Sequence, residues 1–479
     1  MNALRTVLMA SACLLTSLGV RALDPVTTTP GFTPLTQAQL PDGRKLLAGF
    51  LETARGISVS RQFAVERHDT DGSVDATFGG GVVGIPIWGY LEGAYAIAVR
   101  PDGAIYLAGM ASDPIAQVVG TDFCYPAFCE QYVAIVRLKR DGELDTSFNG
   151  NGRVVLRFGS YEQYDDAPDY ANLKTISLQE DGKILVDTNF GLNTARINSD
   201  GTIDDSFEPP YPITMVAAGV PSAGANFQDL WWNPAEPGWN ISFAHQGDVL
   251  FATWATYDMN GKPMWLSMAA IQFAPGTYAG TLYHSTGPAY TTFPFDPSKV
   301  KLTEAGNAVL VFGDDGHARF GYQAFGVSAT KDIQRYAFNG SFITRCTWGG
   351  PQDAANLQGL WYAAPSGSEP GWGVSIAQQG NALAITLLTY DLDGSPLWLY
   401  GEVHDDYGDE YQGGLYRTAG PWFGTPAFAA HPITATAAAG IDVSGAYGNN
   451  MALSIYMNGA WQEKDMTRYV FRGSATTCE

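Results

Sequence analysis

Short apolar runs alternate with Asp-Gly turns along the first half of the chain, in two recurring motifs. An Asx-Gly pair between apolar runs indicates a β-hairpin, because both residues tolerate the backbone angles of a tight reversal. The two motifs alternate three times, at intervals typical of propeller blades. The first motif reads LPDGRKLLAGF, VRPDGAIYLAGM and LQEDGKILVDTNF, and the second reads HDTDGSVDATF, KRDGELDTSF and NSDGTIDDSF. The pattern predicts three units of antiparallel strands in residues 35–211.

A different pattern follows and occurs twice: NFQDLWW returns as NLQGLWY, EPGWNISFAHQG as EPGWGVSIAQQG, and TYDMNGKPMWL as TYDLDGSPLWL. Trp239 and Trp372 are 133 residues apart, and so are Tyr336 and Tyr469, which means that the copies differ by little net insertion. Each copy has β-type runs joined by short turns and no helical periodicity, which favours an antiparallel meander. We predict two modules, each an up-and-down barrel or a two-sheet sandwich. They occupy residues 226–346 and 356–478, and residues 212–225 read as a linker.

The N-terminal motifs resemble the delta-60 repeat of secreted bacterial proteins. The resemblance covers residues 35–210 and rests on both motifs recurring three times in the same order. It implies four-stranded, blade-like units, of which three are too few to close a ring. The array is then open, completed by another part of the chain, or completed by a second molecule through its open blade edges. The expected fold class is all-β, with propeller-like repeats followed by two tandem antiparallel barrel or sandwich modules.

The net charge and the N-terminal residues indicate the class of partner and the cellular location of the protein. The formal net charge is −21, so nucleic acid is not an expected partner, because phosphate binding requires a cationic face. An early Arg5 and an apolar run from Val7 to Val20 predict a secretory signal peptide, residues 1–22, cut near Ala22. The run is shorter than the roughly 20 residues of a membrane span. We expect a secreted protein, extracellular or periplasmic, with no membrane span.

Four cysteines follow the signal peptide, and an even number in an exported chain indicates disulfides. Cys124 and Cys129 lie close together in an insertion and predict a local bridge. Cys346 and Cys478 fall at matching module ends, so a bridge between them would fasten the modules together. The alternative for this second pair is two free or intermolecular thiols.

The repeated aromatic residues are the first candidates for ligand binding. The Asx-Gly turn in each copy is expected to bring Tyr257 close to Trp265, and Tyr390 close to Trp398, on paired strands. Each pair is either a packing contact that stabilises its hairpin or a platform that stacks on a sugar or another flat apolar ligand. Packing is the more common role of aromatic residues at fixed strand positions.

The strand after EPGW adds two serines to the candidates. One face of this strand is apolar and includes Trp239 and Trp372, whereas the other face carries small residues, Ser242 and Ser375 among them. Small residues on a strand indicate that another sheet, a narrow barrel interior or a ligand approaches closely.

Groups that catalyse are scarce. Neither His245 nor His284 is kept in the second module, where Gln378 and Arg417 take their places, and the common hydrolase and nucleotide motifs are absent. We assign no catalytic residue, no metal site and no cofactor. The Asp-Gly turns offer carboxylates to calcium, but they lack the EF-hand spacing, and turn residues are the favoured interpretation.

The function expected from these patterns is that of a secreted, non-catalytic binding or scaffold protein. It would recognise a glycan or an envelope protein through its duplicated aromatic sites, since two weak sites on one chain gain avidity. One alternative is a secreted glycan-acting hydrolase with carboxylates drawn from separate loops. The other alternative is a purely structural or adhesive surface protein. Burial of the tryptophans that occur in both modules would favour this alternative. Those tryptophans are Trp239, Trp265, Trp372 and Trp398.

Overall fold

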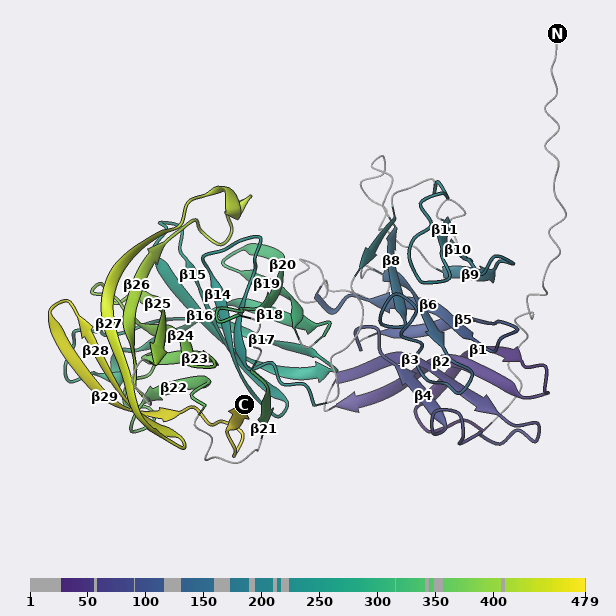
Figure 1. Ribbon diagram of the computed structural model, residues 1–479, viewed down its shortest axis with the longest axis horizontal. Coiled ribbons are helices and arrows are strands. Elements are labelled where there is room, and N and C mark those ends of the chain that lie inside the picture. The colour runs from purple at the N-terminus through teal and green to yellow at the C-terminus, as the bar shows by residue number, and fades with distance from the viewer. Residues whose placement is uncertain are drawn as a thin grey trace, which may run out of the picture. The chain divides into compact units, whose positions relative to one another are not determined.

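The computed structural model is almost entirely β-strand, as expected, and forms two compact units (Figure 1). Residues 1–113 and 128–219 belong to the first unit, and residues 114–127 and 220–479 to the second. The described part of the chain contains no helix long and apolar enough to cross a membrane. The expected signal peptide and the Cys124–Cys129 pair lie outside the described residues. These are 27–55, 58–89, 91–115, 131–158, 173–188, 194–209, 213–216, 224–314, 316–340, 344–348, 356–405 and 410–478.

The first unit contains three antiparallel sheets, which we call the first, second and third blades. The first blade has β1 (Phe32–Gln39), β2 (Lys45–Arg55), β3 (Ser58–His68) and β4 (Val82–Ile85), in chain order. The second has β5 (Glu92–Val99), β6 (Ile105–Ser112), β7 (Gln131–Leu138) and β8 (Arg153–Phe158). The third has β9 (Leu173–Leu178), β10 (Ile184–Thr188) and β11 (Thr194–Ile197).

The strand that follows the third Asp-Gly unit does not join the third blade. This strand, β12 (Ile213–Val216), pairs with β8 of the second blade, with Ile213 opposite Phe158. The segment expected to be a linker, residues 212–225, therefore includes a strand at residues 213–216. The third blade has three strands among the described residues, whereas the first two have a fourth at the matching place.

An arginine, an aspartate and a phenylalanine fold each Asp-Gly unit onto its own blade. In the first blade Arg67 donates to Asp75 over 2.7 Å, and its guanidinium lies 4.7 Å from the Phe78 ring centre. The second and third blades repeat this arrangement. Their sets are Arg137, Asp145 and Phe148, and Arg196, Asp204 and Phe207.

The second unit consists of two closed, eight-stranded barrels, so the barrel alternative holds in both modules. Each is an up-and-down meander closed by its first and last strands, where Trp231 pairs with Arg335 and Trp361 with Arg468. The first barrel has β13 (Asp229–Trp232), β14 (Asn240–Gln246), β15 (Val249–Tyr257), β16 (Pro263–Ala274), β17 (Thr277–Thr286), β18 (Lys301–Phe312), β19 (His317–Ala324) and β20 (Val327–Arg335). The second has β22 (Gly359–Ala363), β23 (Gly373–Gln379), β24 (Ala382–Tyr390), β25 (Pro396–Asp405), β26 (Tyr411–Ala419), β27 (Thr434–Tyr447), β28 (Asn450–Met457) and β29 (Ala460–Arg468).

Two short strands after the barrels join the modules. β21 (Cys346–Trp348) pairs with β30 (Thr476–Cys478), close to the C-terminus in Figure 1. Cys346 lies opposite Cys478 in this ladder, and the two form the expected disulfide. Two single-turn helices, η1 (Pro297–Lys299) and η2 (Phe428–Ala430), lie at equivalent places in the loops before β18 and β27.

Candidate functional site

The aromatic residues expected to form duplicated sites lie where the two barrels meet. The Tyr257 ring lies 5.7 Å from the Trp398 ring, and the Trp265 ring lies 6.0 Å from the Tyr390 ring. Within the hairpin, the backbone of Tyr257 is opposite Pro263 instead of Trp265. Each ring therefore packs on the other barrel, which corrects the expected pairing inside one hairpin.

Burial removes these four rings from contact with a ligand. Each side chain is between 0 and 4% exposed, and Trp239 and Trp372 are almost as deeply buried. The Tyr257 hydroxyl donates to Gly238 O over 2.5 Å, and burial raises its pKa to about 12. A stacking platform requires an exposed ring face, and none of these rings offers one. Their geometry is that of an interface core.

The small-residue face of β14 and β23 also lies between the barrels. Ser242 and Ser375 are both buried, and Ala377, on the same face as Ser375, packs with Leu230 of the first barrel. Among the three expected causes of small residues, the close approach of another sheet is the one present.

The contacts between the barrels occur in reciprocal pairs. Gln228 Nε2 donates to Gln358 O over 3.2 Å, and Gln358 Nε2 donates to Gln228 O over 2.9 Å. Gln246 Nε2 binds Tyr469 O, and Gln379 Nε2 binds Tyr336 O, both over 2.8 Å. Such exchange of the same patch is the mark of an isologous, twofold interface. The tandem modules are therefore a pseudo-dimer within one chain.

Each barrel closes one mouth of the other. Phe423, from the loop of the second barrel, lies 5.1 Å from the ring of Trp254 in the first, and the Tyr322 hydroxyl donates to Phe423 O. Tyr290, at the equivalent position in the first module, is buried in the core of the second barrel and accepts a hydrogen bond from Asn458.

A buried polar side chain braces the other end of each barrel. His245 Nδ1 accepts from Phe227 N over 3.0 Å, with the Tyr278 hydroxyl 3.0 Å from Nε2. In the second barrel Gln378 makes the matching bonds, to Leu357 N and the Tyr411 hydroxyl. Burial lowers the pKa of His245 to about 4, so the imidazole is neutral near pH 7. His245 is a structural brace that a glutamine replaces.

An exposed aromatic pair lies instead on the outside of the second barrel. Trp461 and Tyr456 face each other across β29 and β28, with ring centres 5.2 Å apart, and they are 66% and 44% exposed. The next partners in the ladder are Gly440 on β27 and Gly414 on β26. Partners in antiparallel strands share a face, so these four residues form one row, which we call the aromatic ledge.

A row of polar side chains runs beside the aromatic ledge. It contains Glu463, Ser454, Asp442 and Gln412, which are again partners across the same four strands. Gln412 Nε2 donates to Asp442 Oδ2 over 2.9 Å, which orients both side chains. A Cβ on Gly440 would meet only Tyr456 Cβ, at 3.9 Å, and one on Gly414 would meet only the side chain of Tyr416, at 3.8 Å. A flat apolar face can lie on the ledge while its hydroxyls reach carboxylate, hydroxyl and amide groups.

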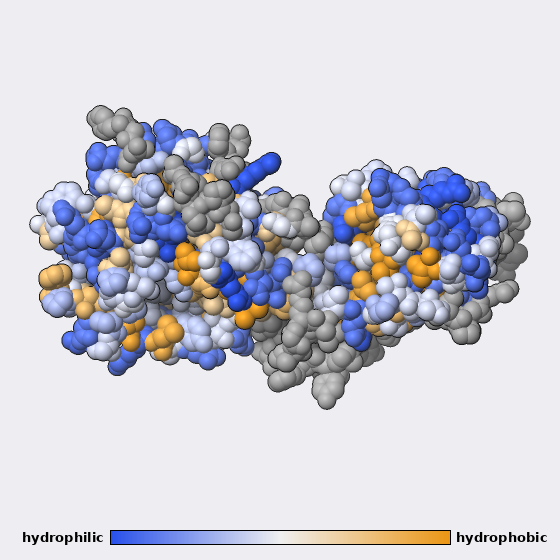
Figure 2. Space-filling view, turned by 90° about the horizontal axis from the view of Figure 1, so that it is seen from below, coloured by the Kyte–Doolittle hydropathy of each residue, from blue (hydrophilic) through white to orange (hydrophobic). Residues whose placement is uncertain are grey.

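The aromatic ledge has no counterpart on the first barrel. The positions equivalent to Tyr456 and Trp461 are Gln323 and Ser328. The stretch SIYMNGAWQEK is therefore not duplicated, and its signal in the sequence is an aromatic residue on each side of an Asn-Gly turn. The face drawn in Figure 2 has hydrophilic residues over much of its surface and apolar ones in smaller groups.

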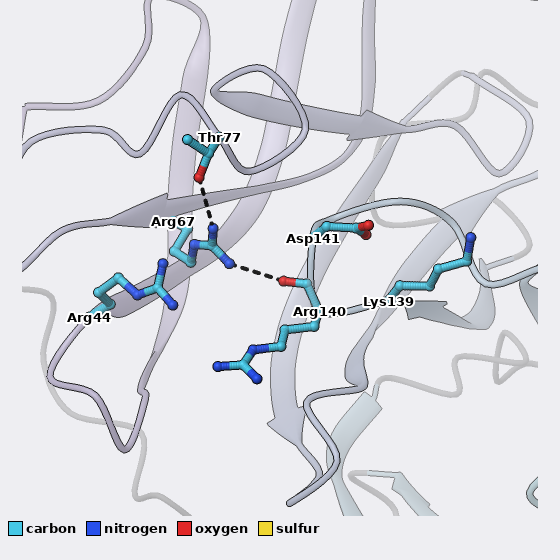
Figure 3. A pocket seen from close by; sticks show the side chains of 6 residues that line it. All are labelled: Arg44, Arg67, Thr77, Lys139, Arg140 and Asp141. Carbon is cyan, nitrogen blue, oxygen red and sulfur yellow. Dashed lines mark hydrogen bonds between the residues drawn. The ribbon is translucent and has the colours of Figure 1, made fainter.

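A second candidate is a cavity of about 500 Å³ at the junction of the first and second blades. Figure 3 shows the guanidinium groups of Arg44, Arg67 and Arg140 directed toward a common space. Hydrogen bonds from Thr77, and the charge of Arg67, lower the pKa of neighbouring Asp75 to about 2, so its carboxylate pairs with Arg67 and Arg44. Lys139, Thr77 and Asp141 complete the lining.

Arg140 is the cation of this cavity that lacks an ion pair among the described residues. Lys139 pairs with Glu143 over 2.8 Å, and Arg44 also pairs with Asp42 over 2.7 Å. A free guanidinium beside two others can bind a carboxylate, sulfate or phosphate through two parallel hydrogen bonds. The signal in the sequence is an arginine that recurs four residues before the aspartate of the Asp-Gly turn, at Arg67, Arg137 and Arg196.

The aspartates of the Asp-Gly turns have the geometry of turn residues. Asp71, Asp141 and Asp200 each accept the backbone N–H two residues later, over 2.9 to 3.0 Å. This bond fixes the turn and occupies one carboxylate oxygen. Across the described ranges, no group of three His, Cys, Asp or Glu side chains is placed to hold a metal ion.

Residues 130–148 and 179–207 match a family described as a domain of unknown function (DUF5122) beta-propeller. The matched residues include β7, β10, β11 and three Asp-Gly turns. The first unit is a propeller-like β-repeat array. The delta-60 resemblance of the same motifs stays a prediction. No curated protein matches the chain.

Two solved structures resemble the chain only distantly. A mutant of the GH43 protein BlXynB from Bacillus licheniformis is 8% identical with a TM-score of 0.20, and covers 94% of this chain and 95% of its own. The tail fiber of Staphylococcus aureus phage P68 is 8% identical with a TM-score of 0.17, and covers 92% and 95%. At such TM-scores neither structure carries an argument about fold or function.

Proposed function

We propose that the protein binds a polysaccharide outside the cell without transforming it, and that the sugar chain lies on the aromatic ledge. The observation that carries the proposal is the exposed Trp461–Tyr456 pair on a rigid barrel wall. Tryptophan is on average a well-buried residue, and aromatic residues exposed next to each other are a feature of binding surfaces.

The size of the aromatic ledge supports a polymer over a single sugar. It crosses four neighbouring strands, and strands lie about 4.8 Å apart, so the row is about 14 Å long. The polar row beside it supplies acceptors from Glu463 and Asp442 and an amide from Gln412 for sugar hydroxyls. The row follows the curved outer wall of the second barrel and is longer than a single sugar ring.

Retention on microcrystalline cellulose and on chitin, measured by depletion from solution, tests the proposal. Trp461→Ala should weaken retention about tenfold or more, because an aromatic contact contributes about 1.4 kcal/mol. Phe293→Ala is the matched control, since Phe293 is 97% exposed on the first module and should not affect retention. Equal retention of both variants, or no retention of the wild-type protein together with no signal on a glycan array, would contradict the proposal.

The unmodified first barrel offers a gain-of-function test. Gln323→Tyr with Ser328→Trp places the two rings at the equivalent positions of β19 and β20, where Gln323 and Ser328 are already partners. The variant should be retained more strongly than wild type, because two sites on one chain act together. Release of reducing ends from the same polysaccharides would replace the non-catalytic proposal by the hydrolase alternative.

The cationic cavity favours a second candidate function, the binding of an anionic group. Titration calorimetry with oligogalacturonate and with inorganic phosphate separates a sugar carboxylate from a phosphate as the ligand. Arg140→Ala should weaken binding by roughly tenfold to a hundredfold, since a hydrogen bond to a charged group contributes about 1.5–3 kcal/mol. Arg61→Ala is the control, because Arg61 pairs with Glu52 six residues along β3 from Arg67.

A further inference from the structure

The two junctions between blades use the same two hydrogen bonds. At the first junction, Gly79 N donates to Asp141 O and Arg67 Nη1 donates to Arg140 O, both over 3.0 Å. At the second junction, Asn149 N donates to Asp200 O and Arg137 Nη1 donates to Ser199 O, both over 2.6 Å. Each blade thus presents donors to the Asp-Gly turn of the blade that follows.

The third blade presents the same donors at the end of the array. Arg196 is the equivalent of Arg67 and Arg137, and the backbone N–H of Glu208 is the equivalent of those of Gly79 and Asn149. Arg196 uses its Nε and Nη2 on Asp204 and Ser206 of its own blade. Within the described residues, neither Arg196 Nη1 nor Glu208 N has an acceptor.

The first blade presents the matching acceptors at the start of the array. Thr70 O and Asp71 O are the equivalents of the carbonyls that the two junctions use, and no described residue donates to them. The space beside the Asp-Gly turn of the first blade is also open, unlike that beside the equivalent turns of the other two blades. A Cβ on Gly142 would lie 3.1 Å from the Phe78 ring and one on Gly201 would lie 2.7 Å from Asn149 N, whereas one on Gly72 would have no atom within 4 Å.

We propose that two copies of this chain join head to tail, the third blade of each docking on the first blade of the other. Arg196 and Glu208 N–H of one copy would bind Thr70 O and Asp71 O of the other. The same contact with the roles of the two copies reversed would close the ring on its other side. Two arrays of three blades give six, which falls within the four to eight blades of closed propellers. Closure satisfies every open donor and acceptor and limits the assembly to two chains.

Light scattering on the full protein should give twice the mass of one chain. Glu208→Pro removes the N–H donor and should give the mass of one chain, whereas Glu208→Ala keeps the donor and should stay a dimer. Circular dichroism verifies that both variants remain folded. A wild-type protein with the mass of a single chain at 100 µM, or equal masses for the two variants, would overturn the proposal.

Cysteine pairs test the geometry directly. Asp71→Cys with Glu208→Cys should give a covalent dimer on a non-reducing gel, and Asn149→Cys with Asp200→Cys is the reference, because it bridges an existing junction inside one chain. A bridge between residues 71 and 208 within one chain would mean that three blades close alone. A ladder of longer oligomers would mean an open filament. Either result, or no bridge where the reference forms, excludes the six-bladed ring.

Discussion

Trp265 and Trp398 occupy the same position in the two modules, and each donates its indole N–H to a backbone carbonyl of the other barrel. Trp265 binds Thr389 O over 3.0 Å and Trp398 binds Thr256 O over 2.8 Å. The two tryptophans that were candidates for a sugar-stacking platform are therefore buried residues of the interface between the barrels. Their role changes the expected outcome of replacing them.

Replacing either tryptophan by alanine should destabilise the second unit. Each side chain is at most 4% exposed, so truncation leaves a cavity and an unpaired carbonyl, at a cost of about 3–5 kcal/mol in the free energy of unfolding. Urea denaturation followed by fluorescence measures this loss. A variant as stable as wild type but deficient in polysaccharide retention would restore the duplicated-site hypothesis.

Removal of the Cys346–Cys478 bridge should also destabilise the barrel pair. The bridge closes a loop with a sequence separation of 132, for which chain entropy gives about 4–5 kcal/mol. Cys346→Ser with Cys478→Ser should therefore lower the melting temperature measured by calorimetry. Dithiothreitol should lower that of the wild type by a similar amount, and identical melting of oxidised and reduced protein would contradict the prediction.

His245 should make the stability of the first barrel depend on pH. Its pKa is about 4 in the folded protein and 6.5 when unfolded, so the unfolded state binds more protons between these values. Stability should fall by about 3 kcal/mol as the pH falls from 6.5 to 4. His245→Gln keeps the bonds that Gln378 makes and should remove this dependence, as urea midpoints at pH 7 and pH 4.5 would reveal. An equal loss in the variant would exclude His245 as the cause.

Phe423 should stabilise a barrel to which it does not belong. It fills the mouth of the first barrel beside Trp254 and Tyr322, so Phe423→Ala should cost about 3–5 kcal/mol there. Hydrogen exchange should accelerate in β15 and β19 before it does in β24 and β28. If hydrogen exchange accelerates equally in both barrels, or in neither, the conclusion that each barrel closes a mouth of the other is contradicted.

Local periodicity was sufficient to predict the strands, the blades and the duplication. The Asp-Gly turns and the 133-residue offset are short-range or repeated signals, and they predicted the all-β class and a barrel or a sandwich for each module. The matching positions of Cys346 and Cys478 in an exported chain predicted their bridge. The position of β12 was not predictable, because a strand pattern does not specify which sheet edge it joins. Its pairing with β8 depends on tertiary contacts.

The candidate site was less predictable because repetition was used as its marker. In this chain the repeated aromatic residues form the interface between the two barrels, which contains each contact twice. Trp265 and Trp398 each donate a hydrogen bond to the other barrel. The aromatic ledge is present once, and exposure, not sequence, distinguishes Trp461 from the buried tryptophans. The alternation of apolar and polar residues along one strand does not show whether a residue is buried at an interface between modules.

The reciprocal contacts of the barrels have a consequence for how such a chain can change. In a homodimer of separate subunits every substitution appears on both sides of the twofold axis. Fusion into one polypeptide removes that obligation, so one half can diverge while the other preserves the fold. The pairs of equivalent positions His245 and Gln378, inside the barrels, and Ser328 and Trp461, on their outer walls, record this freedom, whereas the shared interface stays symmetric.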